Sequence, residues 1–160
     1  MSETPEQKAA DLAAEFEGFS SIPYLDTVAV PHVWTIGYGS IWQNGDGQTP
    51  VTKDTPPIDE PTARAWMATE LKSTALTIAD TVQVVLTDDE KAALEDFIFN
   101  LGAGNFRSST LLVKLNAGDY AGAALEIDKW DHAGGVVVAG LLRRRQAETD
   151  LFNTPDAAPA

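Results

Sequence analysis

The longest helical pattern in the chain spans residues 60–82, and it separates two parts of the sequence with different periodicities. Its apolar residues recur at helical spacing; they are Ala65, Trp66, Leu71, Ala75, Leu76 and Ile78. A region with strand-like alternation precedes this pattern, and several shorter helical patterns follow it. A long helix in this position is expected to bridge a small sheet-containing lobe and a larger helical lobe.

Capping signals predict where the helices begin. Residues that favour the N-cap precede several apolar periodic segments, and glycines close some of them. Thr87 with Glu90 has the pattern of a capping box. The expected helices cover residues 5–17, 60–82, 87–101, a short segment from Ser108 or Ser109 to 116, 119–130 and 141–152, with breaks at 102–105 and 134–135.

A hairpin is expected between the first two helices. Bulky and smaller side chains alternate from Val33 to Gly39, which indicates a strand. A turn centred near Val30-Pro31 places Asp26 across from Thr35. Together these patterns predict a mostly helical α+β fold, a single domain over residues 1–160. We expect a small lobe over about 15–60, a helical lobe over about 61–152 plus the N-terminal helix, and a tail over 153–160.

Composition excludes several classes of function. The 160 residues are 44% hydrophobic, contain no cysteine and carry a formal net charge of −13. So acidic a chain is a poor ligand for nucleic acid, because phosphate contacts need a basic face. His32 and His132 have no partners at ligand spacing and no glycine-rich phosphate loop is present, so we expect no metal and no cofactor. Residues 1–8 do not resemble a signal peptide, and no apolar stretch is long enough for membrane insertion.

Acidic residues near the predicted hairpin are the candidates for chemistry. Glycoside hydrolysis needs one carboxylic acid to protonate the leaving oxygen and one carboxylate to activate water or stabilise the cation. Glu17 ends the first helix and Asp26 follows in the first extended segment, while the hydroxyl of Thr35 is able to hold a water. From residue types alone, Glu17 is equally well explained as a solvated helix-end glutamate, and helical periodicity does not separate it from Glu15.

Several blocks of the sequence resemble the phage lysozyme family, glycoside hydrolase family 24. The family pattern Glu-Gly, Tyr-x-Asp and Thr-x-Gly-Tyr-Gly occurs within residues 16–40, as Glu17-Gly18, Tyr24-Leu25-Asp26 and the segment that begins at Thr35. Residues 99–124, 129–135 and 140–148 are similar to the helical lobe of its endolysin branch. The resemblance covers nearly all of the chain except the tails and residues 42–60.

This resemblance implies a two-lobed muramidase with a catalytic Glu-Asp-Thr set at Glu17, Asp26 and Thr35. Burial of Glu17 in the cleft is expected to keep it protonated as the acid, because desolvation raises a carboxyl pKa. Asp26 and Thr35 then direct water, generally with inversion in this family. The sugar-contacting positions of the family correspond to Ile41, Phe99 and Ser109. A basic residue among 143–145 is expected to orient Glu17, unless these arginines are solvated or pair the lobes.

The chain also departs from the family pattern. The link from Thr27 to Trp34 is longer than usual and lacks a glycine, Ser40 replaces a common histidine, and residues 44–61 look expanded. Three alternatives to a hydrolase stay open: a lytic transglycosylase, a non-catalytic wall-binding relative and a phage tail component. For an endolysin we expect a monomer held in the host cytoplasm until a separate holin releases it to the periplasmic cell wall, with peptidoglycan as its partner.

Overall fold

The computed structural model describes residues 2–133 and 135–155, and it confirms a mostly helical α+β fold. Within these residues, no helix is both long and apolar enough for a membrane span. The predicted tail lies partly outside them, at 156–160. The elements are α1 (Pro5–Phe16), β1 (Ser20–Asp26), β2 (Val33–Gly37), η1 (Gln43–Gly45), α2 (Glu60–Thr81), α3 (Asp88–Leu101), α4 (Ala103–Arg107), α5 (Thr110–Asn116), α6 (Tyr120–Ile127), β3 (His132–Ala133), β4 (Val136–Val137) and α7 (Ala139–Phe152).

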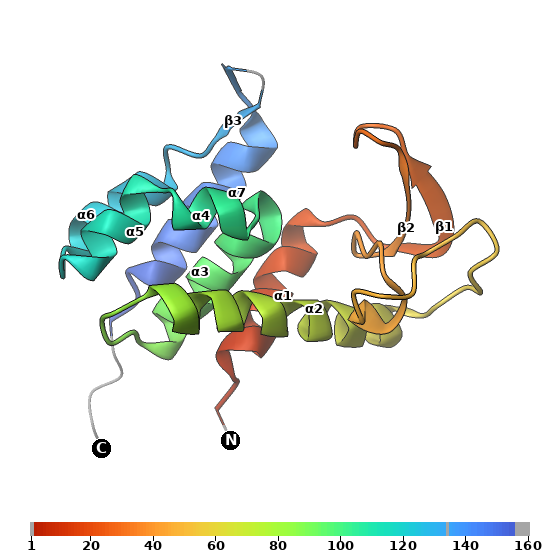
Figure 1. Ribbon diagram of the computed structural model, residues 1–160, viewed down its shortest axis with the longest axis horizontal. Helices are drawn as coiled ribbons and strands as arrows, with labels where there is room; N and C mark the ends of the chain where they lie inside the picture. Colours follow the sequence, from red (N-terminus) through yellow and green to blue (C-terminus); the bar gives the residue numbers. More distant parts are fainter. Residues whose placement is uncertain (1, 134, 156–160) are drawn as a thin grey trace.

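Two lobes stand side by side along α2, as Figure 1 shows. One end of α2 lies under the β1–β2 hairpin and η1, and the other end lies under the bundle of α3 to α7. The side chain of Asp59 caps α2 by accepting from the amide of Thr62, and Pro61 occupies the first turn. The bridging helix predicted from its length is therefore present.

The helix starts follow the capping signals of the sequence. Thr4 and Thr87 each form a capping box, with Gln7 and Glu90 respectively. Ser109 caps α5, and Asp119 likewise caps α6. One predicted break contains structure instead, because α4 occupies most of the segment at 102–105. The predicted break at 134–135 falls between β3 and β4, and residue 134 lies outside the described residues.

The register of the hairpin differs from the prediction. Asp26 pairs with Val33, and Tyr24 is the residue across from Thr35. The turn centres between Ala29 and Val30 rather than at Val30-Pro31, and moving a turn centre by one residue moves every partner by two. Asp26 and Thr35 still lie on one face of the hairpin, as diagonal neighbours, because the side-chain period of a strand is two.

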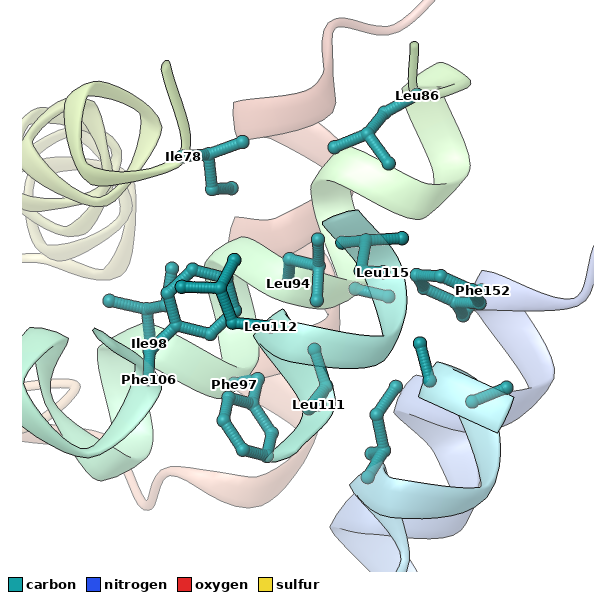
Figure 2. Close-up of a cluster of buried hydrophobic side chains, with 14 residues drawn as sticks. Ile78, Leu86, Leu94, Phe97, Ile98, Phe106, Leu111, Leu112, Leu115 and Phe152 are labelled. Carbon is teal, nitrogen blue, oxygen red and sulfur yellow. The ribbon is translucent and has the colours of Figure 1, made fainter. Parts of the chain in front are cut away.

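Two buried clusters form the core, one within the helical lobe and one between the lobes. The larger lies among α3, α4, α5, α6 and the end of α7, where Phe97 packs edge-on against Phe106 (Figure 2). The smaller joins alanines of α1 to Met67 and Leu71 of α2, and it includes Tyr38 just after β2. The second cluster fixes the end of α1 against the hairpin, and this is the region in which Glu17 lies.

Candidate active site

A groove runs between the lobes as three adjoining hollows. The central hollow, of about 310 Å³, is lined by Glu17, Tyr38, Gly39, Ile41, Trp42, Glu70, Phe99 and Asn100. It shares Glu17 and Asn100 with a hollow of about 430 Å³ beside the start of α7. It shares Glu70 and Phe99 with a third, of about 400 Å³, between α2 and α4. We call the three together the interlobe groove.

Glu17 lies where α1 ends and the chain turns toward the hairpin. It is the C-cap residue, and its backbone is extended (φ −91°, ψ 125°), which takes its side chain out of the helical stripe. Glu15, two residues earlier, is exposed. The Glu17 side chain keeps 28% of its surface exposed, and its Oε2 approaches Gly39 across the central hollow. A Cβ at Gly39 would lie 3.5 Å from that oxygen, and the residue has a positive φ of 88° that favours glycine.

Arg144 of α7 orients the Glu17 carboxyl. Its Nη1 donates to Glu17 Oε1 at 2.7 Å. Its Nε and Nη2 donate to the two carboxylate oxygens of Asp96 at 2.9 and 2.7 Å, a forked pair in which both side chains are buried. Burial opposes the charge of Arg144, but Asp96 and Glu17 outweigh it, so the pKa of the guanidinium lies above its ordinary value. Arg144 is therefore a fixed cation whose charge Asp96 already balances.

The other two arginines of residues 143–145 have different surroundings. Arg145 is fully buried, donates to Glu148 at 2.5 Å and lies 5.2 Å from the ring centre of Phe97. Arg143 is exposed and lines the outer hollow. One arginine thus orients Glu17, one sits in the core of the helical lobe, and one is available to solvent.

Asp26 and Thr35 lie on the hairpin face that also carries Tyr24. Asp26 Oδ1 accepts from the amides of Val28 and Ala29 at 2.8 and 3.3 Å, which fixes this carboxylate at the start of the loop. Thr35 is buried, and its hydroxyl has no hydrogen-bond partner. Burial, then the negative charges of Asp26 and Glu17, raise the pKa of Tyr24. The charges of both carboxylates therefore act on the Tyr24 hydroxyl, which lies on the hairpin face of Asp26 and Thr35.

The three expected sugar-contacting residues divide between groove and scaffold. Ile41 and Phe99 line the central hollow from opposite lobes. Ser109 lines none of the three hollows: it is buried, donates to the carbonyl of Phe106 at 2.7 Å and accepts from the amide of Leu112. Its hydroxyl caps α5, and we find no free polar group at this position for a sugar.

Glu70 also lines the central hollow, although no motif in the sequence marks it as functional. It lies on α2 in the stripe of positions 63, 67, 70, 74 and 77, the other four of which are buried. Helical spacing alone therefore placed a carboxyl on the inward face of the bridging helix. Burial raises the pKa of Glu70 to about 7. The negative charge of Glu17 also raises this pKa, whereas the Ser40 hydroxyl lowers it.

Known proteins match this architecture. The family model of phage lysozyme matches residues 14–148. The chain belongs to the phage lysozyme family. Among curated members, the SAR-endolysin of Enterobacteria phage PA-2 is 35% identical over 135 residues, which are 84% of this chain and 76% of that protein.

Two solved structures are similar to this protein along nearly the whole chain. An endolysin from Escherichia coli O157:H7 phage FAHEc1 matches with a TM-score of 0.79 and 27% identity, covering 96% of this chain and 94% of its own. The muramidase domain of SpmX from Asticaccaulis excentricus matches with a TM-score of 0.78 and 28% identity, covering 92% and 95%. As a phage lysozyme, the chain is a cell-wall-lysing enzyme of the endolysin type.

Proposed function

We propose that this endolysin hydrolyses the β-1,4 bond between N-acetylmuramic acid and N-acetylglucosamine in peptidoglycan, with Glu17 as general acid. The observation that carries the proposal is the position of the Glu17 carboxyl at the centre of the interlobe groove. Arg144 binds one of its oxygens, and the other oxygen faces the hollow. A proton on Oε2 is then aimed at the glycosidic oxygen of a strand lying in the groove.

Asp26 and Thr35 supply the second half of the reaction. Asp26 is held by two backbone amides, and the buried, unpartnered hydroxyl of Thr35 lies on the same hairpin face. A carboxylate and a hydroxyl in this arrangement direct a water at the anomeric carbon as the bond to the leaving oxygen breaks. The leaving sugar takes the proton of Glu17, and Asp26 takes the proton of the water. Ile41 and Phe99 give apolar surface to the pyranose rings.

Substitution of the acid tests the proposal. We expect Glu17→Gln to lower the rate on purified peptidoglycan by at least about 100-fold, because a neutral amide does not donate this proton. The matched control is Glu15→Gln, which removes the same charge two residues away at an exposed position. Thermal unfolding of both variants checks that the fold is kept. A rate for Glu17→Gln near that of the wild type removes Glu17 from the acid role.

Product analysis distinguishes hydrolysis from lytic transglycosylation. Hydrolysis adds a water and leaves a reducing sugar end, whereas a transglycosylase leaves an anhydro end that is lighter by one water. We expect reducing ends by mass spectrometry, because Asp26 and Thr35 are present to direct water. Anhydro ends would replace the hydrolase proposal with a transglycosylase, and binding without turnover would indicate a wall-binding relative.

The names of the relatives support a proposal for the biological setting. The curated relatives are named endolysins and SAR-endolysins of phages. We propose that this chain acts as a monomer on the periplasmic cell wall of the host during lysis, after a separate holin has released it from the cytoplasm. Lysis of cells that co-express a holin, and its absence without one, tests the release route.

A further inference from the structure

Two polar side chains of the central hollow, Glu70 and Asn100, have no part in the proposed mechanism. Both line the hollow, together with Phe99. Glu70 Oε1 and Asn100 Oδ1 are buried, and neither has a hydrogen-bond partner. An unpaired buried polar atom costs stability, so two of them beside one hollow call for a functional explanation.

Other polar groups along these walls already have partners. In the central hollow, Arg144 binds the Glu17 carboxyl, and the Tyr38 hydroxyl donates to Glu60. The hydroxyls that line the hollow between α2 and α4 donate to carbonyls of α2 itself; they belong to Ser73, Thr74 and Thr77. The carboxyl and the amide that remain are therefore the groups to consider for binding a ligand.

Burial decides which of their atoms can meet a ligand. Since Oε1 of Glu70 and Oδ1 of Asn100 are buried, Glu70 meets the hollow through Oε2 and Asn100 through Nδ2. The pKa of Glu70 is raised to about 7, chiefly by burial, so this carboxyl keeps a proton over part of the neutral range. A proton on Oε1 leaves Oε2 as an acceptor, and so does ionisation. The hollow thus offers one acceptor from α2 and one donor from α3.

We propose that Glu70 and Asn100 bind the acetamido group of an N-acetylated sugar in the central hollow. Glu70 Oε2 accepts from the acetamido N–H, Asn100 Nδ2 donates to its carbonyl oxygen, and its methyl group lies against Phe99. The inference rests on the proposed function, in which both sugars of the strand carry this group. It makes Glu70 a specificity-determining residue, because a chain of plain glucose units has no acetamido group to satisfy the pair.

Equilibrium binding of two neutral oligosaccharides tests this role. Chitotetraose and cellotetraose share a β-1,4-linked pyranose backbone, but only chitotetraose carries acetamido groups. We expect the wild type to bind chitotetraose at least about tenfold more tightly, because a site built to hydrogen-bond a group discriminates against a ligand that lacks it. Isothermal titration calorimetry measures both affinities. Equal affinities, or no detectable binding of chitotetraose at millimolar concentration, overturn the proposal.

Two variants of Glu70 separate the polar contact from packing. Methionine has a similar length but offers no comparable acceptor, so we expect Glu70→Met to bind chitotetraose about tenfold more weakly and cellotetraose as the wild type does. Glu70→Gln keeps an acceptor and should keep the preference for chitotetraose. A purely structural role would weaken the binding of both oligosaccharides together. That result, or an unchanged preference in Glu70→Met, contradicts the proposal.

Glu95→Met is the matched control. Glu95 is also a buried carboxyl with an unpartnered oxygen, but it lies on α3 outside the residues that line the groove. Its replacement should leave both affinities unchanged, and thermal unfolding checks that each variant is folded. Because binding needs no bond cleavage, a wild type that prefers chitotetraose through Glu70 but does not cleave peptidoglycan would refute the proposed function alone. Cleavage without this preference would refute the role of Glu70 alone.

Discussion

Arg144 is the residue at which orientation of the acid can be tested apart from its charge. Lysine at this position keeps the positive charge but cannot form both bonds to Asp96 and the bond to Glu17 in the same geometry, since its donors all lie on one nitrogen. We expect Arg144→Lys to lower kcat roughly 10- to 100-fold with little change in KM. We also expect a loss of about 1–3 kcal/mol of stability, because buried oxygens of Asp96 lose a donor.

Steady-state rates on soluble peptidoglycan fragments and thermal unfolding measure the two effects separately. Arg143→Lys is the control, since Arg143 is an exposed neighbour on the same helix. An unchanged kcat in Arg144→Lys would mean that charge alone suffices. The sequence could not identify which arginine of the triple turns inward, because Arg144 and Arg145 are both buried and only the packing of α7 decides their partners.

Among the elements, the sequence predicted what depends on local chemistry and missed what depends on distant contacts. The starts of α2, α3 and α6 agree with their capping residues, because a cap is decided within four residues. The hairpin register was wrong by two residues, since the loop of residues 27–32 offers no signal that fixes its centre. Glu70 was missed for a similar reason, because Ser40 and Gly45, which lie near its side chain, are far from it in the sequence.

The contact of α3 with α1 contains a pH-sensitive group. Glu95 is 2% exposed, and its Oε2 has no hydrogen-bond partner. Burial first, and then the charge of Glu6, raise its pKa to about 8, against a small opposing effect of Lys91. A carboxyl whose pKa is raised on folding contributes stability below its unfolded pKa near 4.5, and this contribution is lost as pH rises through the folded value.

The protein should therefore lose stability between about pH 5 and pH 8, on the order of a few kcal/mol at most, at about 1.4 kcal/mol per pKa unit. We expect Glu95→Gln to flatten this decline and to unfold at a higher temperature than the wild type at pH 8. Denaturant unfolding at several pH values measures both. A wild-type stability that is constant over this range, or that rises with pH, contradicts the role of Glu95.

For the molecule as a whole, the net charge of −13 is unfavourable for binding to an anionic substrate such as peptidoglycan. The chain has 24 aspartate and glutamate side chains but only 11 lysine and arginine side chains. The stem peptides of peptidoglycan also carry carboxylates, so protein and substrate repel each other. Like charges slow the encounter over distances up to the Debye length, which is about 30 Å at 0.01 M salt and about 8 Å at 0.15 M. Added salt should therefore remove a barrier to binding rather than weaken an attraction.

We expect the rate on purified peptidoglycan to rise as monovalent salt increases from about 0.01 M to about 0.15 M, and magnesium to act at lower concentration because a divalent ion screens more strongly. The gain should appear in kcat/KM, since screening changes encounter and not the proton transfer inside the groove. Glycan strands stripped of their stem peptides are the control, because without those carboxylates the repulsion and its salt dependence should largely disappear. Strong inhibition of the intact substrate by moderate salt would instead mean that a local basic surface, such as exposed Arg143 beside the groove, attracts the wall and outweighs the net charge.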